Sequence, residues 1–361
     1  LEIWGSGLGE SAEVTLGDGA TVKFFRTATV GANMTSGGAA NFTTAGGAIT
    51  GTLAGTYVAS SASGASGSVY VKAEPGDRLV IDGDWTISDN GGISFYMTGG
   101  EVEVHSTVTC KTTLNFREGH IRVCDGGVWN LSGGWINYAL DSQYQTGPCC
   151  LEAGTNGTIS VANKGGNCYM HLGGANSKYE SKLLLSGGKY EHGYDTFNLN
   201  KNGTVEIADG ELVLYNPFKA NGTAENSKVV LRGGKLDATS DRLFNGDGSA
   251  TVHVDGHGTI VLPWGTETLD VIPYTDSKNE STACRWTCTP GSILSIPGHT
   301  NGRLGVFTMH NFAADGLVFD LNVRKTQVVL EGLGETIGLG WVLPGASVAK
   351  VTAASATAGG Q

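Results

Sequence analysis

The chain is poor in charged residues and in proline, and it has no long apolar run. Charged residues make up 16% of its 361 residues, and only 8 residues are proline. No apolar stretch approaches the roughly 18 residues that a membrane-spanning helix needs, so the sequence predicts no such helix. No glycine-free run of about ten residues repeats its apolar positions at the helical period. We therefore expect very little helix.

Basic residues are scarcer than acidic ones. The chain has 23 lysines and arginines against 34 aspartates and glutamates, which gives a net charge of −11, and the basic residues form no stripe. A field of this sign repels phosphate backbones. The sequence therefore argues against a nucleic acid as a partner.

Motifs that bind cofactors or nucleotides are also missing. The chain has no nucleophile elbow, no Walker loop, no paired-histidine zinc motif and no EF-hand loop. Its Gly-x-Gly strings, such as Gly5-Ser-Gly7, are not followed by a helical pattern, as a nucleotide site requires. We expect no cofactor, apart from a Ca²⁺ ion that paired carboxylates could bind.

Glycine, in contrast, is abundant, and it recurs in a repeated phrase. The 57 glycines show no collagen period, and they fit a fold with many tight turns. In each repeat a short apolar run meets a glycine turn, and a second apolar run follows. Gly188, Gly210, Gly234 and Gly258 mark four copies that lie about 22 to 24 residues apart, within the range of solenoid repeats.

A parallel β-helix explains this spacing better than an antiparallel β-sandwich, which is the alternative. Equivalent phrases recur after a full coil of about 22 to 24 residues rather than after a hairpin. Stacked coils would pair the backbone of each strand with the coils above and below it, and their aligned apolar residues would form a dry interior. The fold class predicted is therefore all-β.

Composition changes divide the chain into four parts. Residues 1–75 are rich in small residues and are predicted to form an N-terminal β segment or cap, and residues 76–265 carry the repeat of the β-helix core. Residues 266–310 contain Pro273, Pro290 and Pro297 and are predicted to be an insertion. Strand patterns return in residues 311–361, which end in a small-residue tail.

The Leu-x-Gly-Gly-x-Leu/Tyr phrases and the rung Asn-Gly-Thr-Val-x-Ile-x-x-Gly at 202–210 resemble a family of secreted bacterial proteins. These are right-handed β-helix proteins of the pectin-lyase-like superfamily, which include autotransporter passengers and other adhesins. The resemblance covers roughly residues 76–262 and implies an extracellular or cell-surface location. It implies no catalytic residue, since this fold carries polysaccharide lyases and hydrolases as well as adhesins. The start at Leu1 is consistent with a removed signal peptide.

Cysteines are predicted to form disulfides, with buried thiols or a metal site as alternatives. Cys284 and Cys288 could close a small loop, and Cys110 with Cys124 could join adjacent coils. Neither C-x-x-C pairs nor accompanying histidines at zinc-finger spacing are present, so no metal site is predicted. The seven cysteines are Cys110, Cys124, Cys149, Cys150, Cys168, Cys284 and Cys288.

Two groups of polar residues are candidates for catalysis or cation binding. Asp82 and Asp84 are two residues apart, and on one strand face they could share a cation or act as an acid/base pair. Asp next to Gly is also ordinary turn chemistry. His253 and Asp255 alternate with His257 and could form a metal or acid/base cluster, or could be solvated polar positions.

Aromatic residues supply the candidates for glycan binding. Trp129, Trp135 and Tyr138 cluster in the sequence, and exposed rings of this kind stack on sugars. The alternative is that they pack in the interior.

The sequence favours an extracellular, non-enzymatic structural or adhesive β-solenoid. Its partners would be other copies of itself or a cell-surface glycan. The segments Thr29–Ser68 and Ala346–Gln361 could join subunits into a fibre by strand addition or by end-to-end stacking. The alternatives are a polysaccharide lyase or glycoside hydrolase, which would need a groove lined by the carboxylates named above, and a glycan-binding module.

Overall fold

In a computed structural model of the chain, every helix or strand assigned among the described residues is a β-strand. The prediction of an all-β fold is therefore confirmed. No helix in that part of the chain is long and apolar enough to cross a membrane. The described residues are 1–5, 8–60, 67–88, 94–111, 113–131, 136–138, 145–161, 169–174, 176–193, 196–220, 226–238, 242–245, 250–261, 268–273, 285–295, 305–309, 314, 316–320, 326–330, 337–339 and 349–350.

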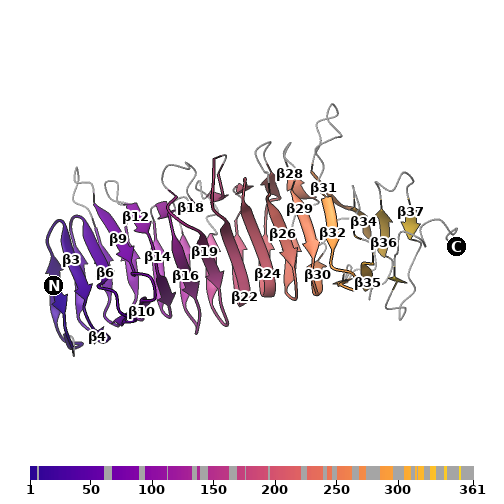
Figure 1. Ribbon diagram of the computed structural model, residues 1–361. Helices are drawn as coiled ribbons and strands as arrows, with labels where there is room; N and C mark the ends of the chain where they lie inside the picture. The colour runs from indigo at the N-terminus through magenta and orange to yellow at the C-terminus, as the bar shows by residue number, and fades with distance from the viewer. Residues whose placement is uncertain are drawn as a thin grey trace.

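The strands stack along an elongated rod, from the N-terminal strands such as β3 at one end to β36 and β37 towards the other (Figure 1). One side of the rod is a 15-stranded sheet, called sheet 1. Its strands are β1 (Glu2–Ile3), β3 (Ala20–Phe24), β6 (Ala40–Thr44), β9 (Ser68–Lys72), β12 (Ser94–Met97), β15 (Thr113–Phe116), β18 (Ile136–Tyr138), β21 (Met170–Leu172), β23 (Phe197–Leu199), β25 (Phe218–Ala220), β28 (Arg242–Asn245), β31 (Thr268–Pro273), β34 (Gly305–Met309), β36 (Thr326–Leu330) and β37 (Ile337–Leu339).

The other strands form a 23-stranded sheet that bends at a corner into two rows. The first row contains β4 (Ala28–Val30), β7 (Thr50–Leu53), β10 (Arg78–Ile81), β13 (Glu101–Val104), β16 (Gly119–Val123), β19 (Cys149–Ala153), the first halves of β22 (Ser181–His192) and β24 (Gly203–Leu214), β26 (Lys228–Leu231), β29 (Thr251–Val254) and β32 (Arg285–Cys288). The second row contains β2 (Glu13–Leu16), β5 (Asn33–Ser36), β8 (Tyr57–Ala59), β11 (Trp85–Ile87), β14 (Thr107–Cys110), β17 (Val128–Leu131), β20 (Thr158–Val161), the second halves of β22 and β24, β27 (Lys235–Ala238), β30 (His257–Val261), β33 (Ile293–Ser295), β35 (Val318–Asp320) and β38 (Ala349–Lys350).

Pairing between consecutive coils is parallel, which confirms the β-helix and excludes the β-sandwich. The register joins Leu183, Val205, Val229 and Val252 in turn, as the predicted coil of about 22 to 24 residues requires. Other coils differ in length: 20 residues separate the paired Glu13 and Asn33, and 34 separate the paired His253 and Thr287. Antiparallel pairing occurs near the C-terminal end of the described chain, in β35 with β38 and β36 with β37.

The same coils run through the predicted boundary at residue 75. Strand β7 pairs in parallel with β10, and β6 pairs with β9. Thr29–Ser68 is one of the two segments predicted to join subunits into a fibre. Within it, β5 is already paired with β2 on one side and β8 on the other. That strand therefore has no open edge for a second chain. Residues 61–66, 346–348 and 351–361 of the two proposed assembly segments lie outside the described residues.

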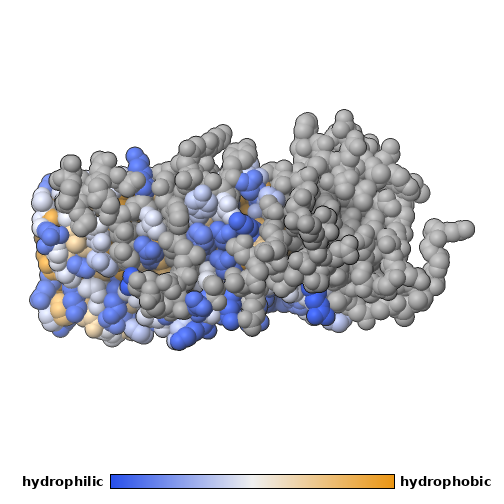
Figure 2. Space-filling model, turned by 90° about the horizontal axis from the view of Figure 1, so that it is seen from above, coloured by the Kyte–Doolittle hydropathy of each residue, from blue (hydrophilic) through white to orange (hydrophobic). Residues whose placement is uncertain are grey.

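The interior is filled by the side chains that alternate inward along each strand. Leu183, Val205, Val229 and Val252 are all 0% exposed. In sheet 1 an aromatic ladder continues this core, with ring centroids 4.9 Å apart for Phe197 and Phe218 and 5.6 Å apart for Phe218 and Phe244. Burial of aligned apolar side chains is the main favourable contribution to stacking coils. Ligands are therefore expected on the outer surface, and the described part of the face seen in Figure 2 is mainly hydrophilic.

Glycines occupy the corner between the two rows, which is where the repeated phrase turns. A Cβ atom built on Gly157 would lie 1.9 Å from the carbonyl oxygen of Val123 in the preceding coil. On Gly210 it would lie 2.1 Å from the oxygen of Gly188. Real Cβ atoms do not approach oxygens so closely, so any larger residue would push the coils apart. The recurring glycine is thus a requirement of coil-to-coil contact.

Replacing one corner glycine tests this requirement. We expect Gly157→Ala to lower the free energy of unfolding by about 1–3 kcal/mol, as overpacking does elsewhere. Gly17→Ala is the matched control, since a Cβ there meets no atom within 4 Å. Its effect should stay within about 0.5 kcal/mol. Urea unfolding followed by circular dichroism measures both; equal effects would contradict the steric argument.

Candidate functional site

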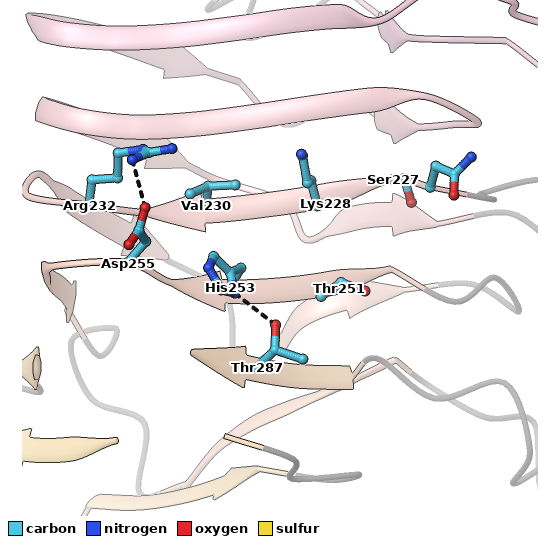
Figure 3. Close-up of a pocket in the computed structure, with 9 residues that line it drawn as sticks. Ser227, Lys228, Val230, Arg232, Thr251, His253, Asp255 and Thr287 are labelled. Atoms are coloured by element: carbon cyan, nitrogen blue, oxygen red, sulfur yellow. Dashed lines mark hydrogen bonds and ion pairs between the residues drawn. The ribbon is translucent and has the colours of Figure 1, made fainter. Parts of the chain in front are cut away.

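A groove of about 490 Å³ lies on the outer surface of the first row, across β26, β29 and β32. Lys228, Val230 and Arg232 lie along one coil, and Thr251, His253 and Asp255 lie along the next (Figure 3). The full lining is Asn226, Ser227, Lys228, Val230, Arg232, Thr251, His253, Asp255 and Thr287.

Strand alternation places these side chains outside. In β26 and β29 the intervening residues Val229, Leu231, Val252 and Val254 are 0% exposed and point into the core. Their neighbours must then face solvent, because successive side chains of a strand point to opposite faces. The groove is therefore built from the outward positions of these strands, which are polar except for Val230.

Most charges in the groove are already paired. The guanidinium of Arg232 contacts Glu206 at 2.8 Å and Asp255 at 2.6 Å. The hydroxyl of Thr289 also donates a hydrogen bond of 2.8 Å to Asp255. These contacts occupy the Asp255 carboxylate with Arg232 and Thr289.

Two further groups in the groove form no ion pair with a described residue. His253 Nδ1 lies 3.0 Å from the Thr287 hydroxyl. Lys228 is exposed, and no carboxylate in the described part of the chain forms an ion pair with it. A lysine without a competing carboxylate can donate its hydrogen bonds to an oxygen-rich ligand.

Of the predicted catalytic residues, His253 and Asp255 come together in this groove. His257 does not join them, since its Nε2 lies 2.7 Å from the Ser295 hydroxyl in the second row. The prediction that Asp82 and Asp84 share a strand face is wrong, because the chain turns the corner between them at Gly83. Asp84 instead accepts a 3.0 Å hydrogen bond from the backbone N–H of Thr107.

Among the described residues, the aromatic candidates for glycan stacking do not form an exposed aromatic surface. Trp129 is 1% exposed, so its predicted role in stacking on a sugar is wrong. It occupies an inward position of β17, opposite Val108 of the preceding coil. Trp135 lies outside the described residues, and Tyr138 is described only as a residue of strand β18.

The described cysteines carry thiols and form no disulfide, contrary to the prediction. They are Cys110, Cys124, Cys149, Cys150 and Cys288. The predicted pair Cys110 and Cys124 is therefore not bonded. Cys168 and Cys284 lie outside the described residues, and Cys288 itself bears a thiol.

A second polar cluster lies on the same row, and no sequence motif predicted it. It joins β10, β13, β16 and β19 through contacts between consecutive coils. His120 Nε2 lies 2.7 Å from a Glu152 oxygen, Arg122 Nε lies 3.4 Å from Glu152, and Arg78 contacts Glu103 at 3.1 Å. Only Arg122 and Glu152 hold the same position of consecutive coils, whereas His120 and Arg78 reach diagonally, since they pair in register with Cys150 and Glu101. The opposite charges of Arg122 and Glu152 were the available signal, but unequal coil lengths obscure that alignment.

The environment of this cluster shifts two pKa values in opposite directions. Burial lowers the pKa of His120, but hydrogen bonds with Cys150 and Glu152 outweigh burial and raise the pKa to about 10. Burial raises the pKa of Glu152, but the hydrogen bonds from His120 and Ser186 and the charges of His120 and Arg122 bring it below its usual range. Both shifts favour the ion pair.

Comparisons with known proteins do not assign the chain to a family. No protein-family model matches it, and no curated protein sequence matches it. One solved structure, the crystal structure of a TibC-catalysed, hyper-glycosylated fragment of TibA, aligns over 90% of this chain and 98% of that one. The sequence identity is 14% and the TM-score is 0.29, values too low to support an argument about either fold or function.

The pair of His120 and Glu152 should make stability depend on pH. The stabilisation from His120 is complete below its usual pKa of 6.5 and is lost as the pH rises towards about 10. The stabilisation from Glu152 is present above its usual pKa of 4.5 and is lost as the pH falls. We expect unfolding in urea to need less denaturant at about pH 9 than at about pH 6, and His120→Gln to reduce that difference. An unchanged difference in the variant would exclude this pair as its source.

The adjacent thiols Cys149 and Cys150 should differ in reactivity. Cys149 is 2% exposed, and burial raises the pKa of its thiol to about 12. Cys150 is half-buried on the outer face, paired in register with His120 and Lys182. We expect iodoacetamide to label Cys150 at least about ten times faster, because the reagent reacts with accessible thiolate. Peptide mass spectrometry measures both rates; equal labelling would contradict the burial of Cys149.

Proposed function

We propose that this protein is an extracellular, non-enzymatic adhesive β-solenoid that binds a glycan in the groove formed by β26, β29 and β32. The observation that carries this proposal is Lys228, an exposed cation with no carboxylate partner in the described residues. Around it the groove offers hydroxyl, amide and imidazole groups. Sugars present many hydroxyl groups, which such side chains bind without chemical change.

The arrangement of charges favours binding over catalysis. A lyase or hydrolase on this scaffold needs an acid and a base free to exchange protons with the substrate. In the groove, Asp255 is held by Arg232 and by Thr289. The polysaccharide lyase or glycoside hydrolase is therefore the weaker proposal.

The overall charge bears on the kind of glycan. A net charge of −11 opposes acidic polymers at long range, but screening limits this effect to about 8 Å in physiological salt. At contact, the charge of Lys228 favours an acidic sugar. Neutral and acidic polysaccharides both belong in the test.

Binding to immobilised neutral and acidic polysaccharides tests this function. For a glycan that binds, we expect Lys228→Ala to weaken the affinity about tenfold, or about 1.4 kcal/mol. Lys219→Ala is the matched control, since Lys219 is an exposed lysine of β25 in sheet 1. Equal effects of the two substitutions, or the absence of any binding, would overturn the groove as the site.

The same incubations distinguish adhesion from catalysis. New unsaturated ends would indicate a lyase, and new reducing ends would indicate a hydrolase. Either product, lost in His253→Ala, would replace the adhesive function by an enzymatic one. Unchanged polysaccharide in the bound fraction supports adhesion.

A further inference from the structure

Three potential metal ligands meet beside the second polar cluster. The donor atoms of His105, Cys124 and Asp125 all lie within 4.8 Å of one another. His105 follows β13, and Cys124 and Asp125 follow β16, so the ligands come from consecutive coils. The register explains the meeting: Val104 pairs with Val123, and the next residues of both strands are His105 and Cys124.

The imidazole nitrogen that faces this cluster lacks a hydrogen bond. His105 Nε2 is shielded from solvent and has no hydrogen-bond partner. The nearest carboxylate oxygens belong to Glu103, at 3.3 Å, and Asp125, at 3.7 Å. The nitrogen thus lies at ion-pair distance from two carboxylates without a directed hydrogen bond, a geometry that a shared cation would explain.

We propose that His105, Cys124 and Asp125 bind a divalent transition-metal ion of the zinc class. One nitrogen, one sulfur and one oxygen donor suit Zn²⁺, which takes imidazole, thiolate and carboxylate ligands in tetrahedral geometry. Glu103 is the nearest further oxygen donor, and Arg78 holds its carboxylate with two contacts of 3.1 Å. The bound ion would link two consecutive coils.

Zinc and cobalt binding by the full chain test the proposal. We expect the reduced protein to bind Zn²⁺ in equilibrium dialysis, and Co²⁺ to give the charge-transfer absorption of a cobalt–thiolate bond. Cys124→Ser should abolish the absorption, and His105→Gln and Asp125→Asn should weaken zinc binding at least about tenfold. Asp125→Asn is the safest variant for folding, because that side chain is 70% exposed.

Cys150→Ser is the matched control, since it removes a half-buried thiol from the same row. It should leave the zinc affinity and the cobalt absorption unchanged. Absence of zinc binding by the unsubstituted chain would overturn the proposal. So would zinc binding that is unaffected by Cys124→Ser and Asp125→Asn, because the ion would then lie elsewhere.

Discussion

The close approach of consecutive coils at the glycine corner is the constraint on which the rest of this structure depends. At that corner the backbone of one coil lies against the backbone of the next, with no room for a Cβ at Gly157 or Gly210. Because this contact lies at the corner that the two rows share, it sets the register of both rows. The register then decides which residues of each strand enter the core and which face solvent. The groove and the second polar cluster both follow from it.

The repeat was enough to predict the fold, because glycine spacing and aligned apolar residues are visible in the sequence. Site residues were harder to predict, since their placement depends on alternation within each coil. Trp129 falls on an inward position of β17, and Asp82 and Asp84 straddle a corner instead of sharing a strand. Contacts such as His120 with Glu152 join residues of different coils, and unequal coil lengths conceal their alignment.

A filled interior confines chemistry to the outer surface, and the first row carries both polar sites. In β13, β16 and β19 the outward residues are mostly charged and mutually paired. In β26 and β29 the same positions hold Lys228, Thr251 and His253, which are available to a ligand. The first row thus carries charged residues that pair with one another at one place along the rod and a groove that can bind a ligand at another. The two places differ in their outward residues, whereas the inward residues are apolar in both.

The charged side chains of the first row also favour one particular order of the coils. The inward residues Leu183, Val205, Val229 and Val252 are nearly interchangeable, so the core would tolerate a chain that skipped a coil. On the outer surface, such a chain would bring like charges together. Omitting β16 would place Glu103 against Glu152 without Arg122 between them, and omitting β24 would place Lys182 against Lys228. Like charges on directly opposed residues are unfavourable. In a β-helix made of similar rungs, these charges therefore favour the native order of the coils over a stack that omits one.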